Sequence, residues 1–465
     1  MATQKQKNAA LNAFRDARPD LEADFAREQT RVAALNEVIK SGPFDLGAGD
    51  TDLYQAFAWR NWQLLRVGGR SAVVLPRGAL SGSPLTEWRQ AVLADGTFAD
   101  VCFLVNNQRW VFPEVHPQYT IALTVTERGG DGVVGWAGPF ASEKEFGSGA
   151  ETLAKIPNEE FVTWSDNFAF PLIPDPKSAQ IFGQMKISPR FDEVREGWAF
   201  RLTNELHSTN DRSLYDFDLS KSAGRTPVLA GASIHLWNPD AAEPYAYAVT
   251  KILRKHLAEK LTVQLRQSRS SYFGMQFSKG VLPMDRPRIV FRKIARATDS
   301  RTSIACLIPP GNSITEAGQI VVTVHGGAKQ EAFLLGVLSS IPFDWAARRW
   351  VEMNFNFYVM NPLPVPLYTE SSVHCARVME IAGSLAASDD RYAIWAAEVG
   401  VPMGSVNSQV HKDELIAELD ALVSLLYGLS EDQVEHVFAT FHRGWKYEPR
   451  LEAVMQHYGT WEGKA

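Results

Sequence analysis

Basic side chains gather in one stretch of this 465-residue sequence, from Lys251 to Arg301. The stretch holds thirteen Lys and Arg residues against three acidic ones, a local balance of +10 in a chain whose formal net charge is −6, so the remainder carries −16. Cations that meet the phosphates of a nucleic acid release its counter-ions, so local charge matters more for such binding than the total. Composition alone leaves two interpretations open, a nucleic-acid surface and a solvated basic face.

Within this stretch, Arg288-Ile-Val-Phe-Arg292 has the composition of a β-strand. Alternate side chains of a strand point to opposite faces, which predicts Arg288 and Arg292 on one face and Ile289 and Phe291 on the other. Two arginines on one face can form paired hydrogen bonds with phosphates or guanine edges. The alternative is a pair of solvated strand arginines.

A second motif with possible chemistry is Phe44-Asp-Leu-Gly-Ala-Gly49, which is similar to a glycine-rich loop that holds S-adenosylmethionine. Such a loop has to follow a buried strand, with an acidic residue for the ribose about twenty positions later. The segment Ile39–Pro43 before it does not have the pattern of a strand, and Leu64–Arg70 contains no acid. We therefore interpret Phe44–Gly49 as a surface turn.

The composition, 45% hydrophobic and 22% charged, is that of a folded globular protein. Its three cysteines lie far apart and suit a reducing compartment better than a disulfide framework or a zinc site. The N-terminus has no apolar signal region, and no stretch approaches the roughly eighteen apolar residues of a membrane span. These features predict a cytoplasmic protein without a membrane partner.

The apolar periodicity predicts the elements that position the candidate residues. We expect two exposed helices between residues 8 and 40, broken at Pro19, and then helices at 52–66 and 85–95. Apolar runs predict strands at 71–76, 99–105 and 119–126, and so a layered α/β sheet with an antiparallel end. The glycine-rich run 129–149 predicts a boundary. A mixed α+β region and about a hundred helical residues follow, including an amphipathic helix at 413–427 and a capping box at Ser430–Gln433.

Three consecutive segments carry a family resemblance: Gly49–Phe57, which contains Asp-Leu-Tyr, Leu64–Pro76, which contains Gly-Gly-Arg and Val-Val-Leu-Pro, and Gly78–Pro84. Together they resemble the stretch that follows the Pro-Pro-aromatic motif in adenine-N6 DNA methyltransferases of the gamma arrangement. The resemblance is nearest to the methylase-plus-specificity chains of type IIG restriction-modification and related phage-defence systems. It implies the rear part of a Rossmann-like methyltransferase sheet.

The segment Val111-Phe-Pro-Glu-Val-His116, followed by the strand 119–126, resembles the family's segment before its late sheet strands. The resemblance implies that Phe112 stacks on the flipped-out adenine. A base extruded from the duplex loses its stacking, and an aromatic face in the pocket restores part of it. On the residues alone, Phe112 is more often a core aromatic at a strand end.

The resemblance continues to about Phe438. Its further segments are similar to the beginning, strand pair and exit of the family's target-recognition domain and to the helical tail: Pro227–His235, Pro287–Thr302 with Leu307–Pro310, Asn354–Tyr358 with Leu363–Pro366, and Glu414–Phe438. It implies double-stranded DNA as a partner and favours a DNA surface for the basic stretch. The DNA-binding residues that we expect are Arg286, Arg288, Arg292, Lys293, Arg296 and Arg301.

Two motifs of the family are missing. Asn361-Pro-Leu-Pro364 has Leu and Pro where the family's adenine-binding tetrapeptide has Pro and an aromatic residue, and a rigid extended exit from a strand explains it better. We expect that tetrapeptide and the cofactor loop upstream of residue 1. S-adenosylmethionine is therefore expected to bind an N-terminal methyltransferase half or subunit, and not this chain alone. No Pro-Asp…Glu-x-Lys nuclease cluster stands out, so cleavage is not predicted.

Two functional classes remain. One is a component of a site-specific adenine methyltransferase, active when its N-terminal partner completes it. The other is a non-catalytic DNA-binding specificity subunit or an inactive fragment. The expected fold is an α/β partial Rossmann-like methyltransferase sheet followed by an α+β target-recognition domain and a helical C-terminal tail. The expected parts are a helical insert (1–45), the methyltransferase rear half (46–150), the target-recognition domain (151–366) and the helical C-terminal region (367–465).

Overall fold

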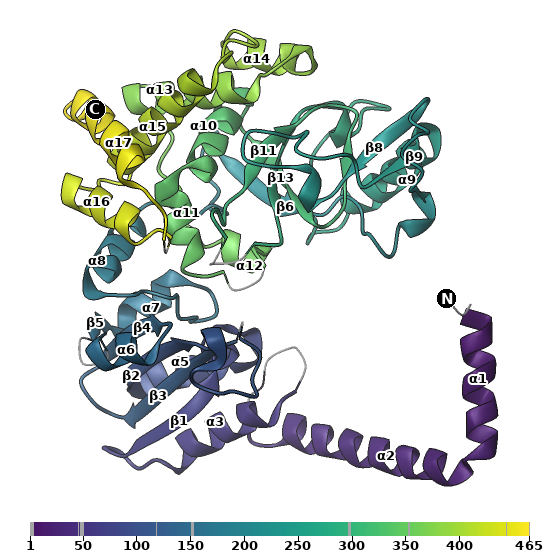
Figure 1. Ribbon diagram of the computed structural model, residues 1–465, viewed down its shortest axis with the longest axis vertical. Coiled ribbons are helices and arrows are strands. Elements are labelled where there is room, and N and C mark those ends of the chain that lie inside the picture. The colour runs from purple at the N-terminus through teal and green to yellow at the C-terminus, as the bar shows by residue number, and fades with distance from the viewer. Residues whose placement is uncertain are drawn as a thin grey trace. The chain divides into compact units, whose positions relative to one another are not determined.

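A computed structural model of the chain describes residues 4–44, 46, 51–117, 119–149, 153–295, 299–351, 354–442 and 444–464 (Figure 1). The chain divides into two compact units, one from Met1 to Asp175 and one from Pro176 to Ala465. Both mix helices with small β-sheets. The finer division into four parts stays a prediction.

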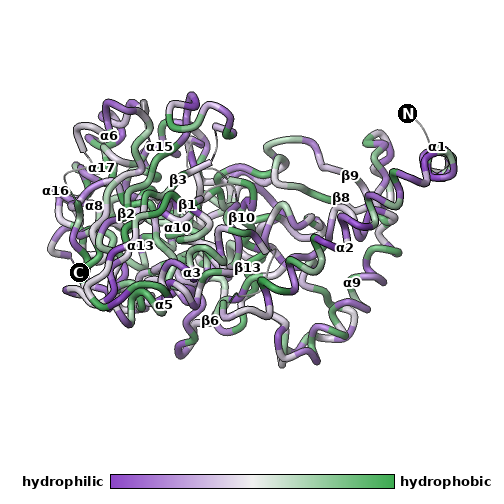
Figure 2. Tube along the Cα trace, turned by 90° about the horizontal axis from the view of Figure 1, so that it is seen from below, coloured by the Kyte–Doolittle hydropathy of each residue, from purple (hydrophilic) through white to green (hydrophobic). Residues whose placement is uncertain are grey.

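Two exposed helices, α1 (Gln4–Ala17) and α2 (Pro19–Ser41), begin the first unit. Pro19 occupies the first position of α2, where its missing N–H would have no helical partner, which explains the expected break. Hydrophilic and hydrophobic residues alternate along α2 (Figure 2). The segment that ends at Ser41 is helical, so no strand leads directly into Phe44–Gly49. Most of that glycine-containing segment lies outside the described residues, and its interpretation as a surface turn stays a prediction.

The first unit contains a five-stranded sheet with the order β1-β3-β2-β4-β5. Its pairs are antiparallel except β2 with β4, which is parallel. The three strands expected from the sequence are confirmed, together with the antiparallel pairing. The strands are β1 (Arg70–Pro76), β2 (Gly96–Val105), β3 (Thr120–Arg128), β4 (Val133–Phe140) and β5 (Ala154–Pro157).

The glycine-rich run 129–149 forms part of this sheet and does not end it. It contains β4 and the helix α6 (Glu143–Gly149), and β5 then pairs with β4. Gly135 stands within β4 because a Cβ there would lie 2.3 Å from the carbonyl oxygen of Ala99. Close backbone approach inside the sheet, and not a linker, accounts for this glycine.

One face of this sheet is packed and the other is open. Helix α5 (Thr86–Asp95) packs on β2 and β3, with α3 (Leu53–Leu64) and α7 (Asn158–Trp164) beside it and α4 (Gly78–Ser81) after β1. Trp88 of α5 meets Phe98 of β2 edge to face, with ring centroids 5.3 Å apart. The opposite face is a mostly apolar surface that is open at β1, β3 and β2. It is lined by Ala72, Val74, Cys102, Leu123 and Val125 together with Asp100, and by Phe146 of α6 and Leu153.

The second unit contains two four-stranded sheets, with the orders β11-β10-β13-β6 and β12-β8-β9-β7. Their apolar faces share a core with helix α9 (Thr250–Gln264), which includes Val290, Ile320, Val228 and Leu257. The strands are β6 (Ala199–Thr203), β7 (Tyr215–Asp216), β8 (Arg225–Leu229), β9 (Ala246–Val249), β10 (Arg288–Arg292), β11 (Ala305–Ile308), β12 (Ser313–Ile314) and β13 (Gly318–His325).

Helices make up most of the remaining second unit, as expected for the C-terminal region. The predicted helix at 413–427 and capping box are confirmed, since the Ser430 N–H donates to Gln433 Oε1 at 2.9 Å. The helices are α8 (Pro176–Met185), α10 (Ala328–Ser339), α11 (Ile341–Arg348), α12 (Phe357–Met360), α13 (Val373–Ala386), α14 (Ala393–Val399), α15 (Gln409–Leu426), α16 (Glu431–Ala439) and α17 (Glu448–Trp461). Over the described residues, none of the helices is both long and apolar enough to cross a membrane.

Candidate functional site

The loop that joins β2 to β3 is built around the buried side chain of Asn106. Its Oδ1 accepts hydrogen bonds from the N–H groups of Val111 (3.2 Å) and Phe112 (3.0 Å). Its Nδ2 donates to the carbonyl oxygens of Phe112 (2.9 Å) and Val115 (3.0 Å). One side chain thus satisfies four backbone groups and fixes the main chain on both sides of Phe112.

The Phe112 side chain projects from this fixed backbone and is 41% exposed. Trp110, two residues before it, is anchored by a 2.8 Å hydrogen bond from Nε1 to the Val105 carbonyl. Gln108 and Arg109 have positive φ angles of 58° and 60°, a conformation that non-glycine residues adopt at a cost of about 1–3 kcal/mol each. Phe112 is therefore not a core aromatic, and the loop presents its ring to solvent. Stacking on adenine stays a prediction.

Sequence analysis did not single out Asn106. The signal was present, because an Asn directly after a strand and before Asn-Gln is typical of a turn. Which backbone groups such a side chain binds depends on the path of the whole loop. The sequence does not define that path.

Arg288 is 7% exposed, and its guanidinium is enclosed by protein groups. It forms an ion pair with the buried carboxylate of Glu205 and donates to the Asn312 carbonyl. Glu205 also accepts the N–H of Ile314 at 3.1 Å. Arg288 thus ties β10 to two neighbouring segments. The structure corrects its expected role, because a paired and buried guanidinium is not open to a phosphate.

Arg292 lies on the same face of β10 as Arg288, as the strand pattern predicts, but it too is closed onto the protein. Its Nε donates to the Gly231 carbonyl at 2.6 Å, and its Nη2 donates to the Ile234 carbonyl at 2.5 Å. Burial lowers the pKa of this guanidinium from its usual value. This pair of arginines is therefore neither free to bind phosphates or guanine edges nor a pair of solvated strand arginines.

The other predicted cations that the structure describes differ in their surroundings. Arg301 pairs with the fully buried Asp344 at 2.7 Å and donates to the Ser339 carbonyl at 2.6 Å. Arg286 is exposed and pairs with Glu398 at 2.6 Å.

Lys293 is half-buried, and Arg296 lies outside the described residues. Of the six predicted residues, Arg286 and Lys293 thus remain candidates for DNA contact on the described part of the chain.

The segment Asn361–Pro364 follows helix α12, and not a strand as expected. Its end is extended, because Pro364 forms a β-bridge with Arg190 and the next N–H, of Val365, donates to the Pro189 carbonyl at 2.8 Å. The proline-rich exit is therefore structural in this part of the chain.

Comparisons with known proteins give no family by sequence: no protein-family model and no curated protein matches the chain. Similar solved structures include the type IIL restriction-modification enzyme MmeI in complex with DNA, at 11% identity and a TM-score of 0.43, over 88% of this chain and 51% of that one. The type IIG restriction endonuclease BpuSI is similar at 12% identity and a TM-score of 0.31, over 88% of this chain and 52% of that one. A DrdV–DNA complex is similar at 11% identity and a TM-score of 0.34, over 73% of this chain and 40% of that one.

The chain thus spans about half the length of the first two of these enzymes. Likeness at these TM-scores does not establish a function.

Proposed function

We propose that the chain is a component of a site-specific adenine-N6 DNA methyltransferase of a restriction-modification or phage-defence system. It supplies DNA target recognition and one wall of the base pocket. The observation that carries the proposal is the loop in which buried Asn106 fixes the backbone and leaves the Phe112 ring exposed. An exposed aromatic on a fixed loop is what stacking on an extruded base requires.

The open face of the sheet in the first unit is a further observation that favours a protein partner. Ala72, Val74, Leu123 and Val125 present apolar side chains there, and β1 pairs with β3 but with no second strand among the described residues. A strand edge with unpaired backbone groups beside an apolar face can accept a further strand and a covering helix. We propose an N-terminal methyltransferase half as the occupant, and this half would bring the loop for S-adenosylmethionine. That cofactor supplies the methyl group when it is bound.

The test compares two DNA duplexes, one fully paired and one with an adenine opposite an abasic site. Extrusion costs less in the second, so a protein with a base pocket should bind it more tightly. Because stacking contributes about 1–3 kcal/mol, we expect a preference on the order of ten- to a hundredfold, read by fluorescence anisotropy.

Phe112→Ala should abolish this preference, and Phe112→Trp should retain most of it. Phe57→Ala, at an equally isolated exposed ring on α3, is the matched control and should bind as the wild type does. Equal binding of both duplexes by the wild-type chain would contradict the base-pocket role. Binding of neither would contradict the DNA function as a whole.

A further inference from the structure

Apart from Arg286, which pairs with Glu398, five cations of the basic stretch are exposed in the described part of the chain, and none of these five is among the residues expected to bind DNA. We call them the α9 surface: Lys251, Lys255, Arg266, Arg269 and Lys279. In the described part of the chain, four of them have no carboxylate within ion-pair distance, and Lys255 has only Glu259, at 3.9 Å across two exposed side chains. Exposed ion pairs of this length contribute little, so the α9 surface keeps its positive charge.

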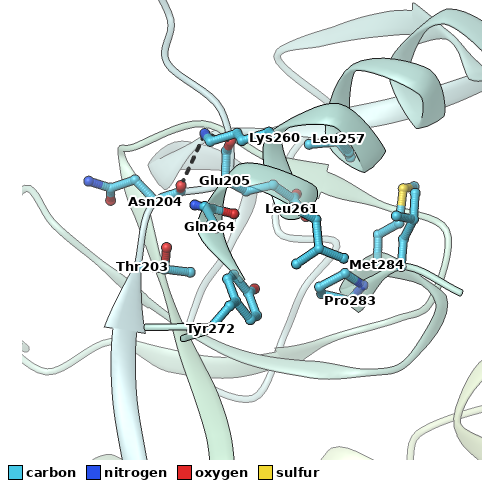
Figure 3. Close-up of a pocket in the computed structure, with 11 residues that line it drawn as sticks. Thr203, Asn204, Glu205, Leu257, Lys260, Leu261, Gln264, Tyr272, Pro283 and Met284 are labelled. Atoms are coloured by element: carbon cyan, nitrogen blue, oxygen red, sulfur yellow. Dashed lines mark hydrogen bonds between the residues drawn. The ribbon is translucent and has the colours of Figure 1, made fainter. Parts of the chain in front are cut away.

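Neighbouring cations are used differently. Lys260 turns inward, where its Nζ donates to the Asn204 carbonyl at 3.4 Å and to the Glu205 carbonyl (Figure 3). Arg254 forms an ion pair with Asp285. The fold therefore separates cations that close internal contacts from cations that face solvent.

Helix α9 divides into two faces. Leu253, Leu257 and Leu261 are buried in the core of the second unit. Lys251 and Lys255, spaced four residues apart, lie on an exposed face of the same helix. The apolar face fixes the orientation of the helix, and so the direction in which the lysines project.

The loop after α9 is tied to the second unit by a buried tyrosine and by hydrogen bonds to its backbone. Tyr272 is buried and lines a small cavity beneath α9 (Figure 3). The next residue, Phe273, is 45% exposed. The Tyr272 N–H donates to Ser270 Oγ at 3.1 Å. Gly274 has a φ of +75°, which suits glycine, and its N–H donates to the Leu265 carbonyl at 3.4 Å. The buried tyrosine thus anchors a loop that leaves Phe273 exposed, between Arg269 and Lys279 in the sequence.

A groove of about 370 Å³ separates α9 from the segment after the loop. Lys255 and Thr262 line its helical side, and Phe277 and Gly280 line the other. Lys279 is exposed and lies between Ser278 and Gly280, two residues that line the groove, although its own side chain is not part of the lining. Exposed cations beside such a groove can neutralise the phosphates of a nucleic-acid backbone.

We propose that the α9 surface holds the phosphate backbone of double-stranded DNA, with its five cations on phosphates and Phe273 against the sugars. The proposal rests on the proposed function in one respect, that the ligand is DNA. It places the electrostatic contact on α9 and its following loop, and not on strand β10.

The test is a salt titration of duplex binding by the full chain. The variant Arg266→Gln/Arg269→Gln/Lys279→Gln removes three charges from the α9 surface. The control Lys329→Gln/Lys446→Gln/Lys464→Gln removes three exposed charges elsewhere in the second unit. Each phosphate contact adds about 0.9 to the log–log slope of affinity against salt. We expect the first variant to lower the slope by about 2 to 3 and the affinity at ~0.1 M salt at least tenfold, with an unchanged melting temperature.

The control variant should bind with nearly the wild-type slope. Equal slopes for the wild type and the α9 variant would overturn the proposal while leaving DNA binding itself established. Absence of wild-type binding would instead overturn the proposed function. A second measurement needs no variant: DNA should protect Lys251, Lys255 and Lys279 from an amine-reactive label and leave Lys329 reactive. Equal labelling of all four with and without DNA would also overturn it.

Discussion

A buried amide side chain has two donor hydrogens and acceptor capacity for two more bonds, and Asn106 uses all four positions on one loop. The consequence for function lies six residues later. Phe112 can offer a ring in a constant position because its own N–H and carbonyl are both held. The pairing of a buried amide with an exposed ring is therefore the smallest unit of the proposed base pocket.

We predict that Asn106→Ala loses the preference for a duplex with an unpaired adenine, although Phe112 is retained. Four backbone groups lose their partner, and since the loop can reach water, the free energy of unfolding should fall by only about 1–3 kcal/mol. The measurements are anisotropy on the two duplexes and chemical denaturation. Asn107→Ala is the control, because that neighbouring asparagine is exposed. A variant that keeps the full preference would show that Phe112 does not need the Asn106 support.

At the scale of elements, strand patterns predicted well where one face is buried. The strands β1, β2 and β3 follow the apolar runs of the sequence, and the arginines of β10 share a face as alternation requires. The strand pattern did not predict the role of the arginines, because that role depends on contacts with residues far away in the sequence. It could not show that Glu205, more than eighty positions before Arg288, closes over that guanidinium. It also missed β4, because glycine breaks the apolar pattern that a strand otherwise shows.

We predict that Arg288→Ala acts on stability, and not on DNA contact. Removal of one partner leaves the carboxylate of Glu205 buried without its cation, which costs about 3–5 kcal/mol. Denaturant unfolding should show this loss, whereas Arg286→Ala, which breaks an exposed pair, should change the free energy of unfolding by about 0–1 kcal/mol. Without denaturant, the folded Arg288→Ala variant should bind DNA with the same slope of log affinity against log salt concentration as the wild type. An unchanged free energy of unfolding together with a lower slope of affinity against salt would show that Arg288 contacts DNA.

At the scale of the whole molecule, charge and apolar surface are distributed over the two units. The first unit has an open apolar sheet face and the Phe112 loop, and the second has the cationic α9 surface. The net charge of −6 does not show this distribution, because it is the sum over a strongly basic stretch and an acidic remainder. The division favours a protein whose first unit combines the proposed base contact with a surface for a protein partner, and whose second unit holds the DNA backbone.

This division leads to a prediction for the chain by itself: it should bind duplex DNA but not S-adenosylmethionine. A glycine-rich cofactor loop has to leave the end of a buried strand, so that its backbone can approach the ligand. Phe44–Gly49 instead follows helix α2, which ends at Ser41. Isothermal titration calorimetry should give no saturable heat with S-adenosylmethionine, and a duplex titrated into the same sample should give a stoichiometric signal that shows the protein to be folded. Stoichiometric binding of S-adenosylmethionine would contradict the prediction and assign a cofactor site to this chain. Gly47→Val and Gly49→Val would then locate it, because side chains there would block a glycine loop but not a pocket elsewhere.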